Sequence, residues 1–431
     1  MEKAVLRVSL LFFSFATMGS AGAARLDYSL ELGALYDDNV RLTENDRSDD
    51  IVLIPRLIFL FTEDATKLTA NVAGDIEYRD YTQGTFSNDF RGTLAGTAVW
   101  HLIPQRMDWV FEDYLGRQPI NVLLDNTPDN QQQTNFFLTG PTLHAHFSDR
   151  SSGQLDLRYA NSYADTTREF NGNRLSALAQ WLYRLSETRS VALYVQDQGV
   201  RYTSAPSTLD YDRQDLYGGY RAVGAHGQLD LEAGYTWLSF RNGGGSDSGV
   251  RLLGRLRYDL GPRTRLGAEV QRSFSDTAQD LIMDPDRIGK VVVGSGLDNM
   301  LVSPQVYTQT RAGVDLSYVT DRHRFSIAPF WRKLDYVTDT TLDEKSVGGY
   351  AEYAFQWTPL TSLQAYAGAD RREYTHLDRT DNDRSYGARL FWQMSRQWLW
   401  RFEVQHTTRS TNTPGLDYTD NQFLVAIRYS R

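Results

Sequence analysis

Histidine is the first residue type to examine for chemistry in this 431-residue sequence. The seven histidines are scattered, and none lies beside a serine in a way that indicates a nucleophile and its general base. His144 and His146 stand out in spacing, because residues i and i+2 of a strand share one face and could offer two nitrogens to a metal ion. No third ligand can be assigned. The sequence therefore predicts no catalytic centre, no metal site and no cofactor, and we do not expect an enzyme.

Carboxylates cluster in two polar stretches, from Asp125 to Asp129 and from Asp378 to Asp383. Flexible loops that supply several oxygen ligands can bind calcium. Neither stretch has the spacing of a dedicated calcium loop. Solvated loops, or contacts to lipopolysaccharide through divalent ions, are the favoured interpretation.

Arginines that alternate with apolar residues are more informative. Arginine can bind a carboxylate or a phosphate through two parallel hydrogen bonds, and tyrosine rings could stack against sugars. These side chains could form opposed ladders along a hydrated solute path, but the favoured interpretation is that they neutralise one another across a wide interior. The residues are Arg158, Arg251, Arg255, Arg257, Arg265, Arg311 and Arg401, interleaved with Asp156, Asp230, Glu232, Glu269, Asp315, Glu352 and Glu403, together with Tyr350 and Tyr366.

The stretch from Gly227 to Thr277 indicates which elements position these charges. It contains three amphipathic segments, with a tight turn at Gly261-Pro262 between the second and the third. Strands of soluble sandwiches are usually about five or six residues long. Here the alternation continues for roughly ten residues, the length at which a tilted strand crosses a bilayer. The pattern predicts a barrel wall with arginine and carboxylate inside and aliphatic side chains outside.

Residues 1–23 are predicted to be a cleaved secretory signal. Basic Lys3 and Arg7 precede a short apolar run that ends at Ala21 and Ala23, although a short buried helix is the alternative. No segment has the roughly twenty continuous apolar residues of a spanning helix, so the chain could cross a membrane only as a closed barrel. Cysteine is absent, which excludes disulfides, and the net charge of −9 argues against a nucleic-acid partner.

The rest of the chain, residues 24–431, shows no linker and no shift in composition. We predict an all-β fold: one transmembrane antiparallel β-barrel of the outer-membrane type, with about twenty strands and a range of sixteen to twenty-two. Short turns should alternate with long loops. Prolines at Pro55, Pro141 and Pro329 fall within strands, where we expect bulges. The longest interruption, Ala278–Ser303, is expected either to fold into the lumen or to form a disordered surface loop.

Short motifs carry a resemblance to a known family. The segment from Leu30 to Leu42, Trp109-Val-Phe-Glu-Asp-Tyr-Leu-Gly, Asp129-Asn130 and Thr139-Gly140-Pro141 resemble the outer-membrane β-barrel porin family associated with exopolysaccharide gene clusters and the exosortase (PEP-CTERM) system. The resemblance implies a barrel encoded beside polysaccharide export machinery. It supplies no catalytic residues.

Two functions follow as expectations. The first is a pore or export-associated channel in the cell outer membrane for a hydrophilic solute, linked to exopolysaccharide export. The second is a structural or adhesion barrel with a plugged lumen, whose loops hold surface polysaccharide or a periplasmic partner. The expected partners are outer-membrane lipid and lipopolysaccharide, with polysaccharide and periplasmic export components as further candidates.

Overall fold

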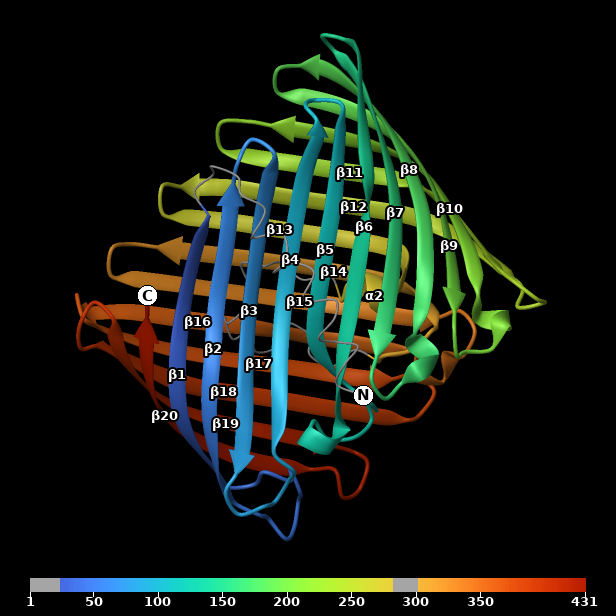
Figure 1. The fold of residues 1–431 in the computed structure, drawn as a ribbon. Helices are drawn as coiled ribbons and strands as arrows, with labels where there is room; N and C mark the ends of the chain where they lie inside the picture. Colours follow the sequence, from blue (N-terminus) through green and yellow to red (C-terminus); the bar gives the residue numbers. More distant parts are fainter. Residues whose placement is uncertain (1–23, 282–300) are drawn as a thin grey trace.

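The computed structural model describes residues 24–281 and 301–431, and the predicted signal peptide lies outside this part of the chain. The described residues form one antiparallel barrel of twenty strands (Figure 1), which confirms the predicted fold class and strand number. The first ten strands are β1 (Arg25–Asp37), β2 (Asp50–Asp64), β3 (Leu68–Tyr81), β4 (Asp89–Ile103), β5 (Met107–Pro119), β6 (Gln131–Ser148), β7 (Ser151–Ala164), β8 (Gly172–Ser186), β9 (Arg189–Tyr202) and β10 (Tyr211–Val223).

The second ten strands are β11 (Gly227–Phe240), β12 (Ser246–Gly261), β13 (Thr264–Asp276), β14 (Val306–Val319), β15 (His323–Tyr336), β16 (Glu344–Thr358), β17 (Thr361–Tyr374), β18 (Arg379–Gln393), β19 (Trp398–Thr411) and β20 (Tyr418–Ser430). Short helices occur in the loops: η1 (Pro128–Asn130), η2 (Arg168–Phe170), η3 (Ser207–Leu209), α2 (Thr277–Asp280) and η5 (Thr340–Leu342). No helix in the described ranges is long and apolar enough to cross a membrane.

The connections alternate in length as predicted. Those that follow even-numbered strands are tight turns, and they lie at one end of the barrel, which we call the short-turn rim. Those that follow odd-numbered strands are longer, except that the connection from β17 to β18 is as short as the one from β18 to β19, and they lie at the other end, the long-loop rim. In outer-membrane barrels the short turns face the periplasm, so the long loops face the outside of the cell.

The barrel closes between its first and last strands. β1 pairs with β20 in an antiparallel register that runs from Ser29↔Ser430 to Asp37↔Gln422. The amide of Tyr28 also donates to the carbonyl of Arg431 at 3.0 Å. Closure leaves no free sheet edge, which is the condition for strands to stand in lipid.

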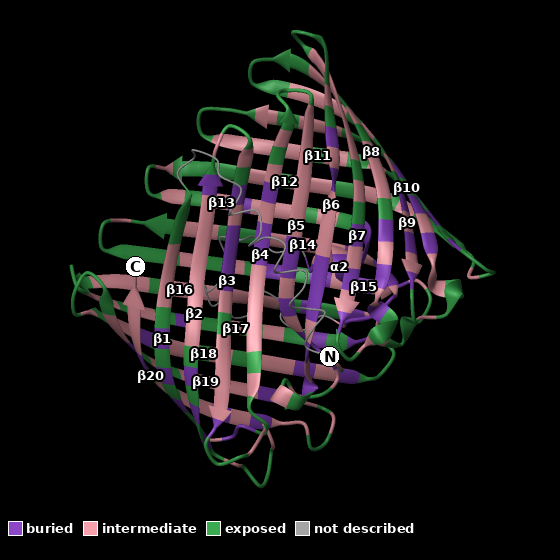
Figure 2. Ribbon diagram, viewed as in Figure 1, coloured by how far each residue is buried: buried purple, intermediate pink, exposed green. Residues whose placement is uncertain are grey.

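Burial alternates along the strands (Figure 2). On β1, Glu31 and Leu35 are buried on the inner face, whereas Leu30 and Leu32 are more than half exposed on the outer face. Lipid covers such an outward apolar belt in a membrane, and this closed barrel with its apolar exterior is therefore of the outer-membrane type.

The three strand prolines interrupt the ladder without bulges. The β14–β15 pairing skips from Gly313↔Phe330 to Leu316↔Ile327 around Pro329, and the register is unchanged. The same gap without a shift occurs at Pro55 and at Pro141. The expectation of bulges is wrong. Proline lacks an amide donor and so interrupts the ladder locally, but this loss does not require an extra residue in the strand.

Candidate functional site

The inner face of the barrel carries the polar groups, and Glu31 joins the strands at the closing seam. Its carboxylate lies 2.6 Å from Arg401 on β19 and 2.7 Å from Arg428 on β20, with Arg56 on β2 at 3.7 Å. Arg56 also pairs with Asp75 on β3. The Glu31 side chain is 2% exposed, so these charges are compensated by one another rather than by water.

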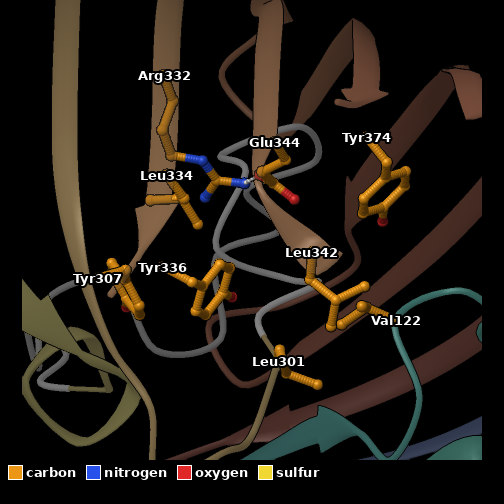
Figure 3. Close-up of a pocket in the computed structure, with 9 residues that line it drawn as sticks. All are labelled: Val122, Leu301, Tyr307, Arg332, Leu334, Tyr336, Leu342, Glu344 and Tyr374. Carbon is orange, nitrogen blue, oxygen red and sulfur yellow. Dashed lines mark hydrogen bonds and ion pairs between the residues drawn. The ribbon is translucent and has the colours of Figure 1, made fainter. Parts of the chain in front are cut away.

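A second buried cluster lies on β15, β16 and β17 near the long-loop rim (Figure 3). Arg332 contacts Glu344 at 2.6 Å, while Arg372 lies 3.7 Å from Glu344 and 2.9 Å from Asp370. These charges border a pocket lined by Val122, Leu301, Tyr307, Arg332, Leu334, Tyr336, Leu342, Glu344 and Tyr374. Val122 and Leu301 come from two different loops, so both loops reach this wall.

One of these loops begins with α2, which lies inside the barrel. Ala278 and Leu281, together with Val302, pack into a buried cluster with Ala95, Tyr114, Phe136, Ala160, Ala164 and Phe170 of the β4–β8 wall. α2 directly follows β13, and Val302 lies shortly before β14, so both of these described ends reach across the lumen to the opposite wall (Figure 1). Both ends of the predicted interruption therefore fold into the lumen. Residues 282–300, with the valines at 291–293, lie outside the described residues.

Polar contacts hold α2 as well. Arg174 on β8 pairs with Asp276 at 2.7 Å across the lumen, and Arg213 on β10 donates to the side chain of Gln279 at 3.1 Å. Asp280 accepts hydrogen bonds from Tyr307 at 2.5 Å and from Ser275 at 2.7 Å. Burial raises the pKa of the Asp280 carboxyl, and these hydrogen bonds offset part of that rise.

The second inserted loop joins β5 to β6. Arg379 on β18 donates to the carbonyl of Leu123 at 2.7 Å, and Arg409 on β19 pairs with Asp125 at 3.0 Å. Burial raises the pKa of Asp125, with Arg409 opposing the rise. The two carboxylate clusters in the sequence thus contribute to arginine pairs: Asp381 also binds Arg379 at 2.8 Å.

The wall formed by β10 to β13 differs, because its charges near the short-turn rim are open to water. Arg255 pairs with Glu269 at 2.7 Å, and Arg265 pairs with Asp259 at 3.0 Å. The arginine side chains are 49% and 66% exposed. Arg257 is also exposed and has no ion-pair partner among the described residues. Asp230 lies 3.5 Å from the exposed Arg221.

Farther from the short-turn rim, the charged side chains of this wall are less exposed and have more contacts. Arg251 pairs with Glu232 at 3.1 Å, and its guanidinium lies 4.3 Å from the ring centre of Tyr217. The Tyr217 ring is stacked on Tyr194 at 4.5 Å. A cation above an aromatic ring is stabilised by the ring quadrupole. Arginine and aromatic faces thus occur together on the lumenal surface.

The other predicted lumen residues lie on the inner face in separate groups. Arg158 donates to Thr142 at 2.6 Å and lies 3.1 Å from Asp156. Tyr350 donates to Glu352 at 2.7 Å. Arg311 faces Gln271 and Arg332 in the ladder and has a partner of its own.

Tyr366 on β17 and Arg401 on β19 both contact Glu403, and through Arg401 this group adjoins the seam. Tyr366 donates to Glu403 at 2.9 Å beneath Arg389, whose guanidinium lies 4.2 Å from the ring centre, and Arg401 lies 3.3 Å from Glu403.

Opposed ladders do not form among the predicted pairs. Each predicted ion pair joins residues of one strand or of neighbouring strands, and the hydrogen bond of Tyr366 on β17 to Glu403 on β19 spans two strands. Cross-strand neighbours on one face are only about 5 Å apart, much closer than opposite walls, so pairing within the wall prevails. The predicted residues therefore lie on one lumenal surface without converging on a single site.

The histidines do not group by the His144 and His146 spacing that the sequence brought out. His101 and His144 hydrogen-bond to the two oxygens of the Asp108 carboxylate at 2.7 and 2.9 Å. His146 is not part of this contact. No group of three or more potential metal ligands occurs among the described residues.

Sequence reasoning missed the buried charges Glu31, Arg56, Arg174, Arg332 and Arg372. All five lie on the inward phase of their strands, as the predicted residues do, so the phase could have identified them. Their partners also lie on strands, but contacts between distant strands, such as that of Arg174 on β8 with Asp276 on β13, depend on a curvature that periodicity does not give.

Comparisons with known proteins bear on the fold. A ferric enterobactin receptor from Pseudomonas aeruginosa is 10% identical with a TM-score of 0.50, covering 95% of this chain and 81% of that chain. A BenF-like porin from Pseudomonas fluorescens is 9% identical with a TM-score of 0.40, covering 95% and 99%. No protein-family model matches the chain, and no curated protein matches it in sequence. The resemblance to the exopolysaccharide-associated family stays a prediction, and what is shown is an outer-membrane β-barrel.

Proposed function

We propose that this barrel is an outer-membrane channel for a hydrophilic solute. The observation that carries the proposal is the wall of β10 to β13, where Arg255, Arg257 and Arg265 are exposed to water on the inner face. Burying an ion without compensation is costly, so water-exposed charges on an inner face indicate a hydrated interior. Arginine there can bind carboxylate or phosphate groups of a passing solute.

The inserted segments determine where a path could run. α2 and the loop between β5 and β6 occupy part of the lumen on the side of the long-loop rim. A solute that crosses would pass beside these segments and then along the open wall of β10 to β13. The same segments support the second candidate, a structural barrel whose loops hold a surface polymer or a periplasmic partner.

Planar bilayer recordings with the purified protein distinguish the two candidates. The channel should conduct ions. The triple variant Arg255→Ser, Arg257→Ser, Arg265→Ser removes three lumenal cations, so its reversal potential in a salt gradient should shift toward cation selectivity. Arg201→Ser is the matched control, because Arg201 lies on the outer face, paired with Asp212. A silent wild type, or equal shifts in both variants, would contradict the channel.

The solute we propose is an exopolysaccharide, or a fragment of one. Support comes from the family resemblance and from the lumenal tyrosines Tyr194, Tyr217, Tyr350 and Tyr366, whose rings could stack on sugars beside arginines. A deletion strain should lose secreted polymer if the barrel exports it. Normal secretion with loss of polymer from the cell surface would favour the structural barrel instead.

A further inference from the structure

Five cations lie together on the outer face of the barrel, where lipid would surround it. We call them the outer belt: Arg272 on β13, Lys333 on β15, Lys345 on β16, Arg371 on β17 and Arg384 on β18. The neighbours of these cations along the chain point into the barrel, which places the cations on the outer face. Examples are Arg332, Ser346 and Arg372, which are at most 4% exposed. Four of the five cations are exposed, and Lys333 is partly exposed.

The outer belt places like charges directly opposite one another. Lys333 and Lys345 are register partners in the β15–β16 ladder, an arrangement that is destabilising without a counter-ion, and on its other side Lys345 faces the exposed Glu373 of β17. They are two of only five lysines in the sequence. Lys333 pairs with Asp335 at 2.7 Å, while Lys345, Arg371 and Arg384 have no ion pair with any described residue. Even with the carboxylates of Asp335 and Glu373 on the same face, the five cations leave the belt a positive excess.

The position of the belt is that of a lipid head group. In each strand an outward apolar residue lies two positions nearer to the short-turn rim: Val270, Trp331, Val347, Ala369 and Tyr386. The cations thus stand at the end of the apolar face, toward the long-loop rim. Arginine and lysine at such a boundary can extend their charged ends into the head-group region.

The belt is confined to one side of the barrel. On β19, β20, β1 and β2, the outward positions near the same rim are uncharged and include Ser410, Thr419, Tyr36 and Ile51. On β9 and β10, outward Arg201 lies against Asp212, which also pairs with Arg241 at 2.8 Å. A general attraction between basic residues and the membrane surface would not place the cations on one side only. The distribution therefore indicates a localised binding site.

We propose that the outer belt binds a phosphate-bearing glycolipid of the outer leaflet, with Lys333, Lys345 and Arg371 at the phosphate groups. Clustered cations beside a membrane-spanning apolar surface recognise anionic head groups. The inference rests on the outer-membrane location and does not depend on whether the barrel conducts.

Native mass spectrometry of the detergent-purified full chain tests the proposal, with bisphosphorylated lipid A as the probe. The triple variant Lys333→Gln, Lys345→Gln, Arg371→Gln should bind lipid A roughly 10- to 100-fold more weakly than wild type. The control Arg263→Gln, Arg322→Gln, Arg396→Gln removes the same charge from exposed positions at the short-turn rim and should bind normally. Lys333→Arg with Lys345→Arg should also retain binding.

Further measurements separate the possible sources of the effect. Dephosphorylated lipid A should bind wild type as weakly as bisphosphorylated lipid A binds the triple variant. Heat-modified migration on gels establishes that each variant is folded before binding is compared. Equal binding by the triple variant and wild type, equal binding of the dephosphorylated lipid, or full competition by millimolar inorganic phosphate would each overturn the proposal.

Discussion

Two regions of the lumen use the same residue types for different purposes. At the seam, Glu31 and its arginines have side chains 2–25% exposed and link strands from both ends of the sequence. On the wall of β10 to β13, Arg255 and Arg265 are about half exposed or more and pair only with a neighbouring strand. Burial decides the difference, because water screens the second set and not the first.

The comparison separates stability from transport. Buried arginine and carboxylate groups that compensate one another hold strands and inserted loops in place, and they leave little charge for a solute. Water-exposed groups contribute little to stability but are accessible to a solute. Charge reversal or removal should therefore have opposite consequences in the two regions.

The largest effect is expected at the seam. Glu31→Ala would leave the buried guanidinium of Arg401 without its closest partner and remove the contact to Arg428, which should cost about 3–5 kcal/mol of unfolding free energy. Urea unfolding, followed by the loss of heat-modified gel migration, measures this cost. Asp259→Ala, which breaks the exposed pair with Arg265, is the control and should cost about 1 kcal/mol or less. Equal losses would remove the distinction between the two regions.

A smaller effect is expected where α2 and the chain at 301–303 meet the β4–β8 wall. Val302 is 1% exposed in that cluster, so Val302→Asp buries a carboxylate among apolar side chains and should cost several kcal/mol locally. The barrel should stay folded, because its strands do not depend on this contact. Single-channel conductance should rise as the segment detaches. Val302→Ala is the control: it shortens the same side chain without adding a charge, so its conductance should stay nearer to that of wild type.

The open wall should respond in selectivity rather than in stability. Exchanging the pair as Arg255→Glu with Glu269→Arg keeps the contact and the net charge, so both stability and reversal potential should stay near wild type. Arg255→Glu alone should shift the reversal potential toward cations, with at most about 1 kcal/mol lost. A shift in the exchanged pair as large as in the single variant would mean that charge position, rather than net charge, governs permeation.

The alternation of apolar and polar residues determines which features of the fold and of the site could be predicted from the sequence. A period of two determines the face of each side chain, so the barrel, its strand number and the inward phase of Arg251 or Arg401 could be inferred from local sequence. Register and curvature are non-local, and Arg401 meets Glu31 only because β20 closes on β1. The contact of Asp125 with Arg409 depends on a loop that crosses the lumen, and no periodicity specifies that path.

The smallest effect concerns pH and the docking of α2. Burial and the nearby charge of Asp276 raise the pKa of Asp280 above the unfolded value near 3.9, although Tyr307, Ser275 and Arg332 oppose the rise. The docked state then binds the proton more tightly, so its extra stability is fully present below the unfolded pKa and is lost as pH rises through the raised value. Hydrogen exchange of residues 277–281, corrected for intrinsic rates, should show stronger protection in acid. Asp280→Asn resembles the protonated form and should make that protection independent of pH, whereas an unchanged pH dependence in this variant would assign the effect to another group.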